Sequence, residues 1–371
     1  MTSPFKTGIP PRVALVLGGG GLKGFAHIGV LRALEERGIR PVLMAGTSIG
    51  ALIAAAYVRG LTIPQMEERA LSLRKPDLFR IDHMGMVVRR MLAPSLYLEQ
   101  PLQDIVDRLA PEGTFRDLAI PLLVNTVDLE RGTQVTWGLP GLQDVRVADA
   151  VYASCALPGF FPPRVIDGRT CVDGGVMENT PALVASRDVD AVIAVDVGST
   201  SLTAARRVRE KGFAAIFMRS AQVMMRSLQQ MQLAAWHGPP LLLVRPPVWR
   251  YNWFSFAHTR TMIDAGYATA CDVLDSVGES LYSAGGVYPR RDVEVLVDRD
   301  RCTGCGMCVT LAPALMRIDE GKATPLAGPL EWSRADGAFV TECPVQAISV
   351  MAIDADGQRH RTMEFRVESD S

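Results

Sequence analysis

Hydrophobic positions along the first 285 residues alternate between short apolar runs and longer stretches with helical spacing. The short runs predict strands at Val13–Leu17, Val42–Ala45, Pro121–Thr126, Val192–Val197 and Leu241–Val244. The longer stretches indicate helices at Phe25–Arg37, Ala51–Arg59, Pro101–Leu109, Val208–Trp236 and Thr259–Val277. Strands that alternate with helices are typical of an α/β fold, with a mostly parallel sheet covered by helices.

A second pattern begins near residue 285. The segment Gly285–Arg291 is rich in turn residues, and a new strand-like run, Val293–Asp298, follows it. A chain of 371 residues with 48% hydrophobic content is long enough for one full-sized domain and a smaller one. We therefore expect domains at residues 10–285 and 291–355, followed by a tail at 356–371.

Charge and hydropathy limit the partners and the location. The net charge of −1 gives no electrostatic reason to expect nucleic-acid binding. The first residues lack the pattern of a secretory signal, and no apolar run reaches the ~20 residues that span a bilayer. We expect a cytoplasmic protein. The segment Leu78–Leu92 mixes apolar residues with arginines and suits either an interfacial helix or a core helix with a basic edge, which leaves peripheral membrane contact open.

A glycine-rich loop follows the first predicted strand. Counted from Gly19, it reads G-x-G-x-x-G, which also occurs in dinucleotide-binding folds. Such folds need an acidic residue at the end of the second strand, where this chain has Gly46-Thr-Ser-Ile-Gly50. A P-loop needs Lys and Ser or Thr after its last glycine, but Phe25 follows Gly24. Both nucleotide interpretations are therefore weakened.

The segment from Gly46 to Gly50 matches G-x-S-x-G, a strand-to-helix turn that exposes a serine hydroxyl. Ser48 would be the nucleophile, unless it only caps the following helix. The backbone amides of the glycine loop can stabilise an oxyanion, and both loops are expected at the same edge of the sheet.

A serine nucleophile also needs a base. None of the histidines after Ser48 lies in a recognisable loop after a strand, and His27 is interpreted as a structural residue of the first helix. Asp173 ends a strand-like run and is followed by two glycines, so its carboxylate can be presented to another loop. A Ser48–Asp173 dyad is favoured over an ordinary Asp-Gly turn.

These motifs resemble those of the patatin-like phospholipases, particularly the bacterial members. The match includes the loop Gly19–Gly24 with Lys23, the elbow with Gly46 and Gly50, and Asp173 followed by Gly174 and Gly175, together with residues 153–163 and 179–181. The resemblance implies an α/β/α sandwich, a Ser48–Asp173 dyad, an oxyanion hole from the amides around Gly19, Gly20 and Gly21, and hydrolysis of acyl esters, typically of lipids. Lys23 keeps the charge of the arginine found in plant members but not its planar fork.

Four of the seven cysteines lie near the C-terminus. Cys302, Cys305 and Cys308 form C-x₂-C-x₂-C, and Cys343 precedes a proline. Four thiolates in this arrangement suit one iron–sulfur cluster better than a zinc site. The other three, Cys155, Cys171 and Cys271, are expected to be core residues.

This arrangement resembles bacterial-type ferredoxins, which implies a small α+β domain. Ala312 stands where a fourth cysteine would serve a second cluster, and the positions of a second cysteine set hold Ser333, Asp336 and Phe339. We therefore expect one cluster, of the [4Fe–4S] type.

The motifs together favour a lipid acyl-ester hydrolase with a one-cluster domain for electron transfer or redox sensing, which would need a redox partner. The alternative is an electron-transfer protein whose first domain only binds lipid or a partner. Ester hydrolysis moves no electrons, so the sequence leaves open whether the cluster gates hydrolysis, transfers electrons or is structural.

Overall fold

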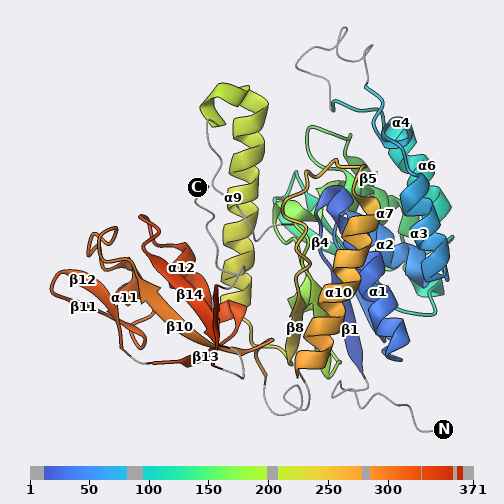
Figure 1. The fold of residues 1–371 in the computed structure, drawn as a ribbon. Helices are drawn as coiled ribbons and strands as arrows, with labels where there is room; N and C mark the ends of the chain where they lie inside the picture. Colours follow the sequence, from blue (N-terminus) through green and yellow to red (C-terminus); the bar gives the residue numbers. More distant parts are fainter. Residues whose placement is uncertain are drawn as a thin grey trace, which may run out of the picture. The chain divides into compact units, whose positions relative to one another are not determined.

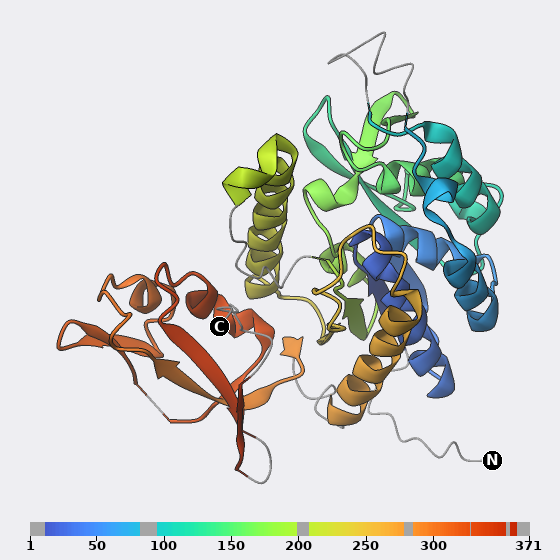
Figure 2. The ribbon, with the colours of Figure 1, turned by 45° about the horizontal axis from the view of Figure 1, so that its top comes forward.

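The computed structural model describes residues 12–81, 95–198, 208–277, 285–326, 328–353 and 357–361 (Figures 1 and 2). Contacts divide the chain into two compact units. Unit 1 comprises Met1–Thr200 and Gly238–Gly286, and unit 2 comprises Ser201–His237 and Val287–Ser371. Residues 201–237 thus group with the C-terminal part of the chain.

Unit 1 is built on a sheet with the strand order β5-β6-β3-β2-β1-β7-β8, in which β4 also pairs with β3. The pairs that link β3, β2, β1, β7 and β8 are parallel, so the predicted mostly parallel sheet is confirmed. Antiparallel strands, which the alternation did not predict, extend the sheet beyond β3. The bounds are β1 Val13–Leu17, β2 Leu43–Gly46, β3 Leu122–Asp128, β4 Thr133–Trp137, β5 Arg164–Ile166, β6 Arg169–Asp173, β7 Ala191–Val195 and β8 Leu241–Val244.

The helices of unit 1 form two groups. Helix α1 contacts α3 and α10, whereas α2, α6 and α7 contact one another. Helices α3, α4, α7 and α8 were not predicted, whereas α1, α2, α6 and α10 fall close to the expected ranges. The bounds are α1 Ala26–Glu36, α2 Ile49–Val58, α3 Ile63–Ser72, α4 Lys75–Leu78, α6 Glu99–Leu109, α7 Val147–Cys155, α8 Ala182–Ala185 and α10 Thr259–Val277, with short 3₁₀ turns η1 Gly21–Phe25, η3 Phe115–Asp117 and η4 Gly174–Val176.

The register of the sheet brings several strand ends to one edge. Leu17, the last residue of β1, is level with Gly46 of β2 and Val195 of β7. Gly46 is level with Val124 of β3, and Asp173 on antiparallel β6 lies opposite Thr126, two residues further along β3. The glycine loop, the serine elbow and Asp173 therefore lie at the same edge, as expected for a site at the carboxyl ends of parallel strands.

Unit 2 contains an antiparallel sheet in the order β13-β10-β14-β15 and a β11–β12 hairpin. The long helix α9 belongs to this unit: it contacts η7, and the amide of Gln230 donates to the hydroxyl of Thr341 at 2.9 Å. The bounds are α9 Gly212–Ala234, α11 Met307–Leu311, α12 Ala338–Thr341, β9 Val287–Tyr288, β10 Arg291–Val297, β11 Met316–Asp319, β12 Lys322–Pro325, β13 Leu330–Trp332, β14 Ile348–Ile353 and β15 Arg359–Arg361, with 3₁₀ turns η5 Val208–Lys211 and η7 Arg334–Gly337.

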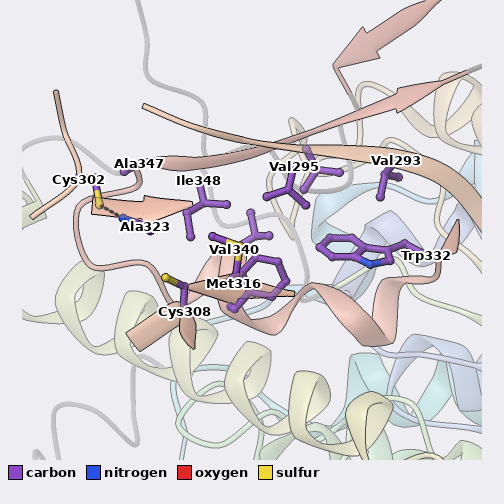
Figure 3. Close-up of a cluster of buried hydrophobic side chains, with 12 residues drawn as sticks. Val293, Val295, Cys302, Cys308, Met316, Ala323, Trp332, Val340, Ala347 and Ile348 are labelled. Carbon is purple, nitrogen blue, oxygen red and sulfur yellow. Dashed lines mark hydrogen bonds between the residues drawn. The ribbon is translucent and has the colours of Figure 1, made fainter. Parts of the chain in front are cut away.

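Figure 3 shows the buried core of unit 2. Of the three positions where a second cysteine set would have stood, only Phe339 belongs to this core. Phe339 is buried, and its ring meets that of Trp332 edge-on at 5.3 Å between centroids. Ser333 and Asp336 instead cap a turn, because the Ser333 hydroxyl donates to the Asp336 carboxylate at 2.8 Å. These positions serve packing and turn formation.

The segment Leu78–Leu92, predicted as either an interfacial helix or a core helix with a basic edge, falls mostly outside the described residues, which resume at Ser95. Its described beginning is the end of α4, followed by Ile81, which forms a β-bridge with Tyr97. Most of the predicted tail, from residue 362 onwards, also lies outside the described residues. Within the described ranges, no helix combines the length and apolar character needed to cross a bilayer.

Candidate functional site

Ser48 lies in the turn between β2 and α2. Its backbone is in the left-handed region, with φ 55° and ψ −129°. Its amide donates to the Ser154 hydroxyl at 2.8 Å, and this hydroxyl donates to the carbonyl of Asn125 at 2.7 Å. Gly46 and Gly50 flank the turn where neighbouring backbone leaves no room for a Cβ atom. The elbow is thus held by residues of β3 and α7, and the Ser48 side chain forms no capping hydrogen bond with α2.

Asp173, the last residue of β6, is 5% exposed, and its carboxyl group lies near the Ser48 side chain. Burial raises the pKa of this carboxyl group to about 6, although the nearby Ser48 hydroxyl and the hydrogen bond from the Gly175 amide lower it. The Gly175 amide donates to Oδ1 at 2.8 Å. Gly174 packs against Asn125 so closely that a Cβ atom there would collide with it. The structure therefore brings together the two groups of the predicted dyad.

The glycine loop runs beside Ser48. A Cβ atom on Gly19 would lie 3.2 Å from the Cβ of Ser48 and 2.6 Å from Oδ1 of Asn179, so only glycine fits there. The Gly19 amide already donates to the Asn179 carbonyl at 3.2 Å. Among the described residues, the amides of Gly20 and Gly21 donate to no protein acceptor. Gly21, with φ 59°, begins η1. The loop thus presents donors next to the serine hydroxyl.

The side chain of Lys23, a residue of the glycine loop, is buried in the protein. Lys23 is 5% exposed, and its ammonium group donates to the carbonyl of Gly198 at 3.5 Å. Burial lowers the pKa of Lys23 to about 8, while the Asp196 carboxylate raises it. The side chain of Lys23 therefore contacts the protein interior rather than solvent. Gly24 packs against Ile49, where a side chain would collide.

His27 also supports the loop, in agreement with its structural interpretation. It is fully buried, and its Nε2 donates to the carbonyl of Gly18 at 2.8 Å. Burial lowers the pKa of His27 to about 4, so the imidazole stays neutral at physiological pH. A neutral, buried histidine next to the loop holds one of its carbonyl groups in place.

Six aromatic rings of unit 1 form a cluster. The carbonyl of Trp253, next to the cluster, accepts from the Leu22 amide at 2.8 Å, and the Asp173 amide donates to the carbonyl of Ala156 at 3.1 Å. Ring centroids within the cluster are 4.9–6.1 Å apart. The rings belong to Phe79, Tyr97, Phe160, Phe161, Phe254 and Phe256. Residues next to the cluster in the chain are thus hydrogen-bonded to the glycine loop and to Asp173.

The four C-terminal cysteines line one pocket of unit 2. Cys302 and Cys308 are buried, Cys343 is half-buried and Cys305 is exposed. The Ala323 amide donates to Sγ of Cys302 at 3.4 Å and lowers the pKa of its thiol (Figure 3), and the Ala347 amide donates to Sγ of Cys343 at 3.3 Å. Amide donors of this kind stabilise thiolates, the form in which cysteine binds iron. In the described part of the chain, however, no three Cys, His, Asp or Glu side chains lie close enough together to hold a metal ion.

Comparison with known families assigns both regions. A family model described as patatin-like phospholipase matches residues 15–186. The chain carries a patatin-like phospholipase domain. A second family model, a 4Fe-4S single cluster domain, matches residues 295–350. The patatin-like match contains Ser48, Asp173 and the glycine loop, and the second contains all four cysteines of the pocket.

Relatives of the patatin-like domain occur in bacteria, fungi and animals. An uncharacterised NTE family protein of Mycobacterium tuberculosis is 36% identical over 197 residues, which cover 53% of this chain and 52% of the relative. Patatin-like phospholipase domain-containing protein 6 of Homo sapiens is 35% identical over 203 residues, covering 52% of this chain and 14% of the relative. Lysophospholipase NTE1 of Mycosarcoma maydis is 36% identical over 200 residues, which cover 52% of this chain and 10% of the relative. The chain therefore spans about half the length of the mycobacterial relative, and much less of the others.

Two solved structures are also similar. VipD from Legionella pneumophila matches with a TM-score of 0.38 and 16% identity, covering 72% of this chain and 67% of that one. The type III effector protein ExoU matches with a TM-score of 0.37 and 18% identity, covering 74% of this chain and 54% of the ExoU chain.

Sequence reasoning found the main residues of the patatin-like site but missed their supports. Ser154 lies in the segment 153–163 that carried part of the resemblance, yet its bond to the Ser48 amide depends on α7 reaching the elbow. Asn125 lies within the predicted strand Pro121–Thr126, and its local sequence gave no sign of a contact with the elbow. Asn179 holds Gly19 from both sides, since its Nδ2 also donates to the Gly19 carbonyl at 3.0 Å. Of the remaining cysteines, Cys171 is buried, and Cys155 and Cys271 are half-buried.

Proposed function

We propose that the patatin-like domain is a serine acyl-ester hydrolase that acts on lipids of the phospholipid or lysophospholipid class. The observation that carries this proposal is the proximity of the Ser48 side chain to the buried Asp173 carboxyl group, whose pKa the hydroxyl lowers. Two unpaired amides lie in the adjacent glycine loop. A nucleophile, a base and oxyanion donors at one strand edge are the parts that acyl transfer requires.

In the proposed reaction, the Asp173 carboxylate takes the proton of the Ser48 hydroxyl as its oxygen attacks the ester carbonyl carbon. The amides of Gly20 and Gly21 donate to the developing oxyanion, and the Gly19 amide joins them only by leaving the Asn179 carbonyl. Asp173 then returns the proton to the departing alcohol, which leaves the acyl group on Ser48. Water attacks this ester after Asp173 removes its proton, and the fatty acid leaves as Ser48 regains its hydrogen.

Two observations favour a lipid substrate. The six-ring aromatic cluster provides an apolar surface beside the glycine loop, as an acyl chain would require. One of the similar proteins is named a lysophospholipase, and another carries a patatin-like phospholipase domain. Lys23 is too deeply buried to bind a lipid headgroup, so headgroup recognition would fall to other residues.

Replacement of the nucleophile tests the proposal. Ser48→Ala should lower kcat for a short monomeric ester and for a lysophospholipid at least about a thousandfold, because no acyl-enzyme can form. Ser72→Ala, on the exposed end of α3, is the matched control and should keep full activity. Undiminished turnover in Ser48→Ala would reject the hydrolase. An absence of turnover in the unaltered chain, combined with lipid binding, would favour the alternative of an electron-transfer protein with a lipid-binding first domain.

We further propose that Cys302, Cys305, Cys308 and Cys343 hold one [4Fe–4S] cluster. The thiol set and the amide donors to two of the sulfur atoms fit this group. When bound, such a cluster supplies one-electron redox chemistry. Around it, the chain contributes an apolar pocket and amide hydrogen bonds that keep thiolate charge stable. The redox partner, the cytoplasmic location and the domain limits at 10–285 and 291–355 stay predictions.

A further inference from the structure

A buried carboxylate of unit 1 lies next to the glycine loop and takes no part in the proposed proton transfers. It belongs to Asp196, which directly follows β7 and whose side chain is fully buried. Asp196 lies outside residues 15–186, which the patatin-like family model matches. An ionised carboxylate is costly to bury unless it is paired and hydrogen-bonded, so its partners indicate its role.

The two carboxylate oxygens of Asp196 contact different segments. Oδ1 accepts a hydrogen bond from the Gly198 amide at 3.1 Å, which fixes the turn after β7. Oδ2 lies 3.4 Å from Nε of Arg245, the residue that follows β8. The backbone amide of Asp196 also donates to the carbonyl of Val244 at 2.9 Å. Asp196 therefore ties the turn at Gly198 to the end of β8.

The turn that Asp196 holds packs directly against the glycine loop. A Cβ atom on Gly20 would lie 2.9 Å from Cγ2 of Val197 and 3.2 Å from Cα of Gly198. A Cβ atom on Gly198 would collide with the carbonyl oxygen of Gly19. The two segments are thus in close backbone contact, and the position of Gly198 limits where Gly19 and Gly20 can lie.

Charge also links Asp196 to the loop. The ammonium group of Lys23 donates to the carbonyl of Gly198, the residue whose amide donates to Asp196. The negative charge of Asp196 raises the pKa values of Lys23 and His27, against the effect of burial. One residue of the loop and one that holds the Gly18 carbonyl are therefore both influenced by this carboxylate.

We propose that Asp196 is a positioning residue for acyl-ester hydrolysis, which holds the turn at Gly198 against the glycine loop and so fixes the oxyanion donors. The inference rests on the proposed function, because oxyanion donors matter only if Ser48 attacks an ester. Preorganised donors stabilise an oxyanion without rearrangement, whereas a displacement of about 1 Å can cost about a hundredfold in rate. Asp196 therefore affects the transition state more than the bound substrate.

Asp196→Asn tests this role, because it removes the charge and keeps the size of the side chain. We expect kcat for a short monomeric ester to fall at least about tenfold, with KM changed by less than about twofold. Inhibition by an alkyl trifluoromethyl ketone should weaken by a similar factor, because its adduct with Ser48 carries an oxyanion. A side chain that only stabilised the fold would not separate kcat from KM in this way.

Asp128→Asn is the matched control. The Asp128 side chain is equally buried, accepts a hydrogen bond from the Glu130 amide at 3.1 Å and forms an ion pair with Arg131 at 2.7 Å. This variant loses a comparable ion pair, but its partners lie within its own turn. It should keep kcat and the inhibition constant of the ketone within about twofold of the parent.

Two further variants test the link even if Asp196→Asn does not fold. Gly198→Ala adds a methyl group against the Gly19 carbonyl and should lower kcat at least about tenfold, whereas Gly328→Ala should not. Lys23→Met should also lower kcat. The loss in Asp196→Asn/Lys23→Met should be smaller than the product of the two single losses, because both side chains act through Gly198.

Three results would overturn the proposal while the hydrolase stands. They are equal kcat values for Asp196→Asn and Asp128→Asn, an undiminished kcat in Gly198→Ala, and a raised KM with unchanged kcat in Asp196→Asn, which would indicate a role in substrate binding. Failure of the hydrolase proposal is measured separately, in the unaltered chain and Ser48→Ala. A parent without turnover that depends on Ser48 would reject the hydrolase and this role with it.

Discussion

Among individual residues, Asp173 has the environment that most affects the proposed chemistry. Its carboxyl group is almost fully buried, and desolvation raises its pKa to about 6. A carboxylate with an ordinary pKa would be a weak base towards a serine hydroxyl. The raised value makes Asp173 a stronger base that is still mostly ionised at neutral pH.

This pKa gives the pH dependence of the reaction. Because the base must be ionised, kcat/KM for a monomeric ester should fall about tenfold per pH unit below pH 6 and level off above it. Asp173→Asn should lower kcat/KM at neutral pH by orders of magnitude and should abolish its fall below pH 6. Steady-state rates between pH 4.5 and 8 measure both effects. If kcat/KM of Asp173→Asn fell with the same midpoint pH as that of the parent, the titrating group would be a residue other than Asp173.

The residues around Ser48 show which parts of the site could be predicted from the sequence. The motif around Ser48 and the Asp-Gly-Gly after a strand were sufficient to pair Ser48 with Asp173. Ser154 and Asn179 could not be assigned, because their contacts join segments more than 100 residues apart in the chain. Such partners depend on helix packing and strand register, which a local pattern does not encode.

At the level of elements, the connection from β1 to α1 is the most tightly packed part of the site. Gly19 lies between Ser48 and Asn179 with no space for a methyl group. The loop therefore keeps its shape through contacts on both sides, and its amides need little rearrangement during the proposed reaction.

Gly19→Ala should disturb this arrangement. The added methyl would lie 2.6 Å from Oδ1 of Asn179 and 3.2 Å from the Cβ of Ser48, so the loop must shift. We expect kcat to fall at least about tenfold with a smaller change in KM, because the oxyanion donors move. Gly328→Ala, where the added methyl meets open space, is the control for the general effect of an alanine. Equal kcat values for Gly19→Ala and Gly328→Ala would show that the tight packing at Gly19 does not affect the reaction.

The predicted elements were most accurate where apolar runs are long and buried. The five predicted strands correspond to β1, β2, β3, β7 and β8, whose residues lie mostly in the core. The antiparallel strands β4 and β5 were missed because their burial comes from pairing at the sheet edge. The helix at 208–236 was found, but its grouping with residues beyond 286 depends on contacts far apart in sequence.

In the whole molecule, the two candidate sites belong to different units. Ser48, Asp173 and the glycine loop belong to unit 1, whereas the four cysteines belong to unit 2. Each unit has its own buried core.

This separation predicts independent loss of the two sites. Cys343→Ser should reduce bound iron and visible absorbance to background, while turnover of a monomeric ester stays within about twofold of the parent. Cys271→Ser, a half-buried thiol of unit 1, should retain both. Turnover should also be equal with the cluster oxidised, reduced or removed. A rate that follows the redox state would instead establish gating between the units.

The backbone of Ser48 has a consequence for how this protein can evolve. A residue other than glycine at φ 55° and ψ −129° raises the free energy of the native state by about 1–3 kcal/mol. Selection for thermal stability alone would therefore favour glycine at position 48, which relieves the strain and removes the hydroxyl. If the proposed activity is what retains Ser48, the chain accepts a lower melting temperature than its fold allows. Heat resistance and reactivity are then opposing demands on a single residue.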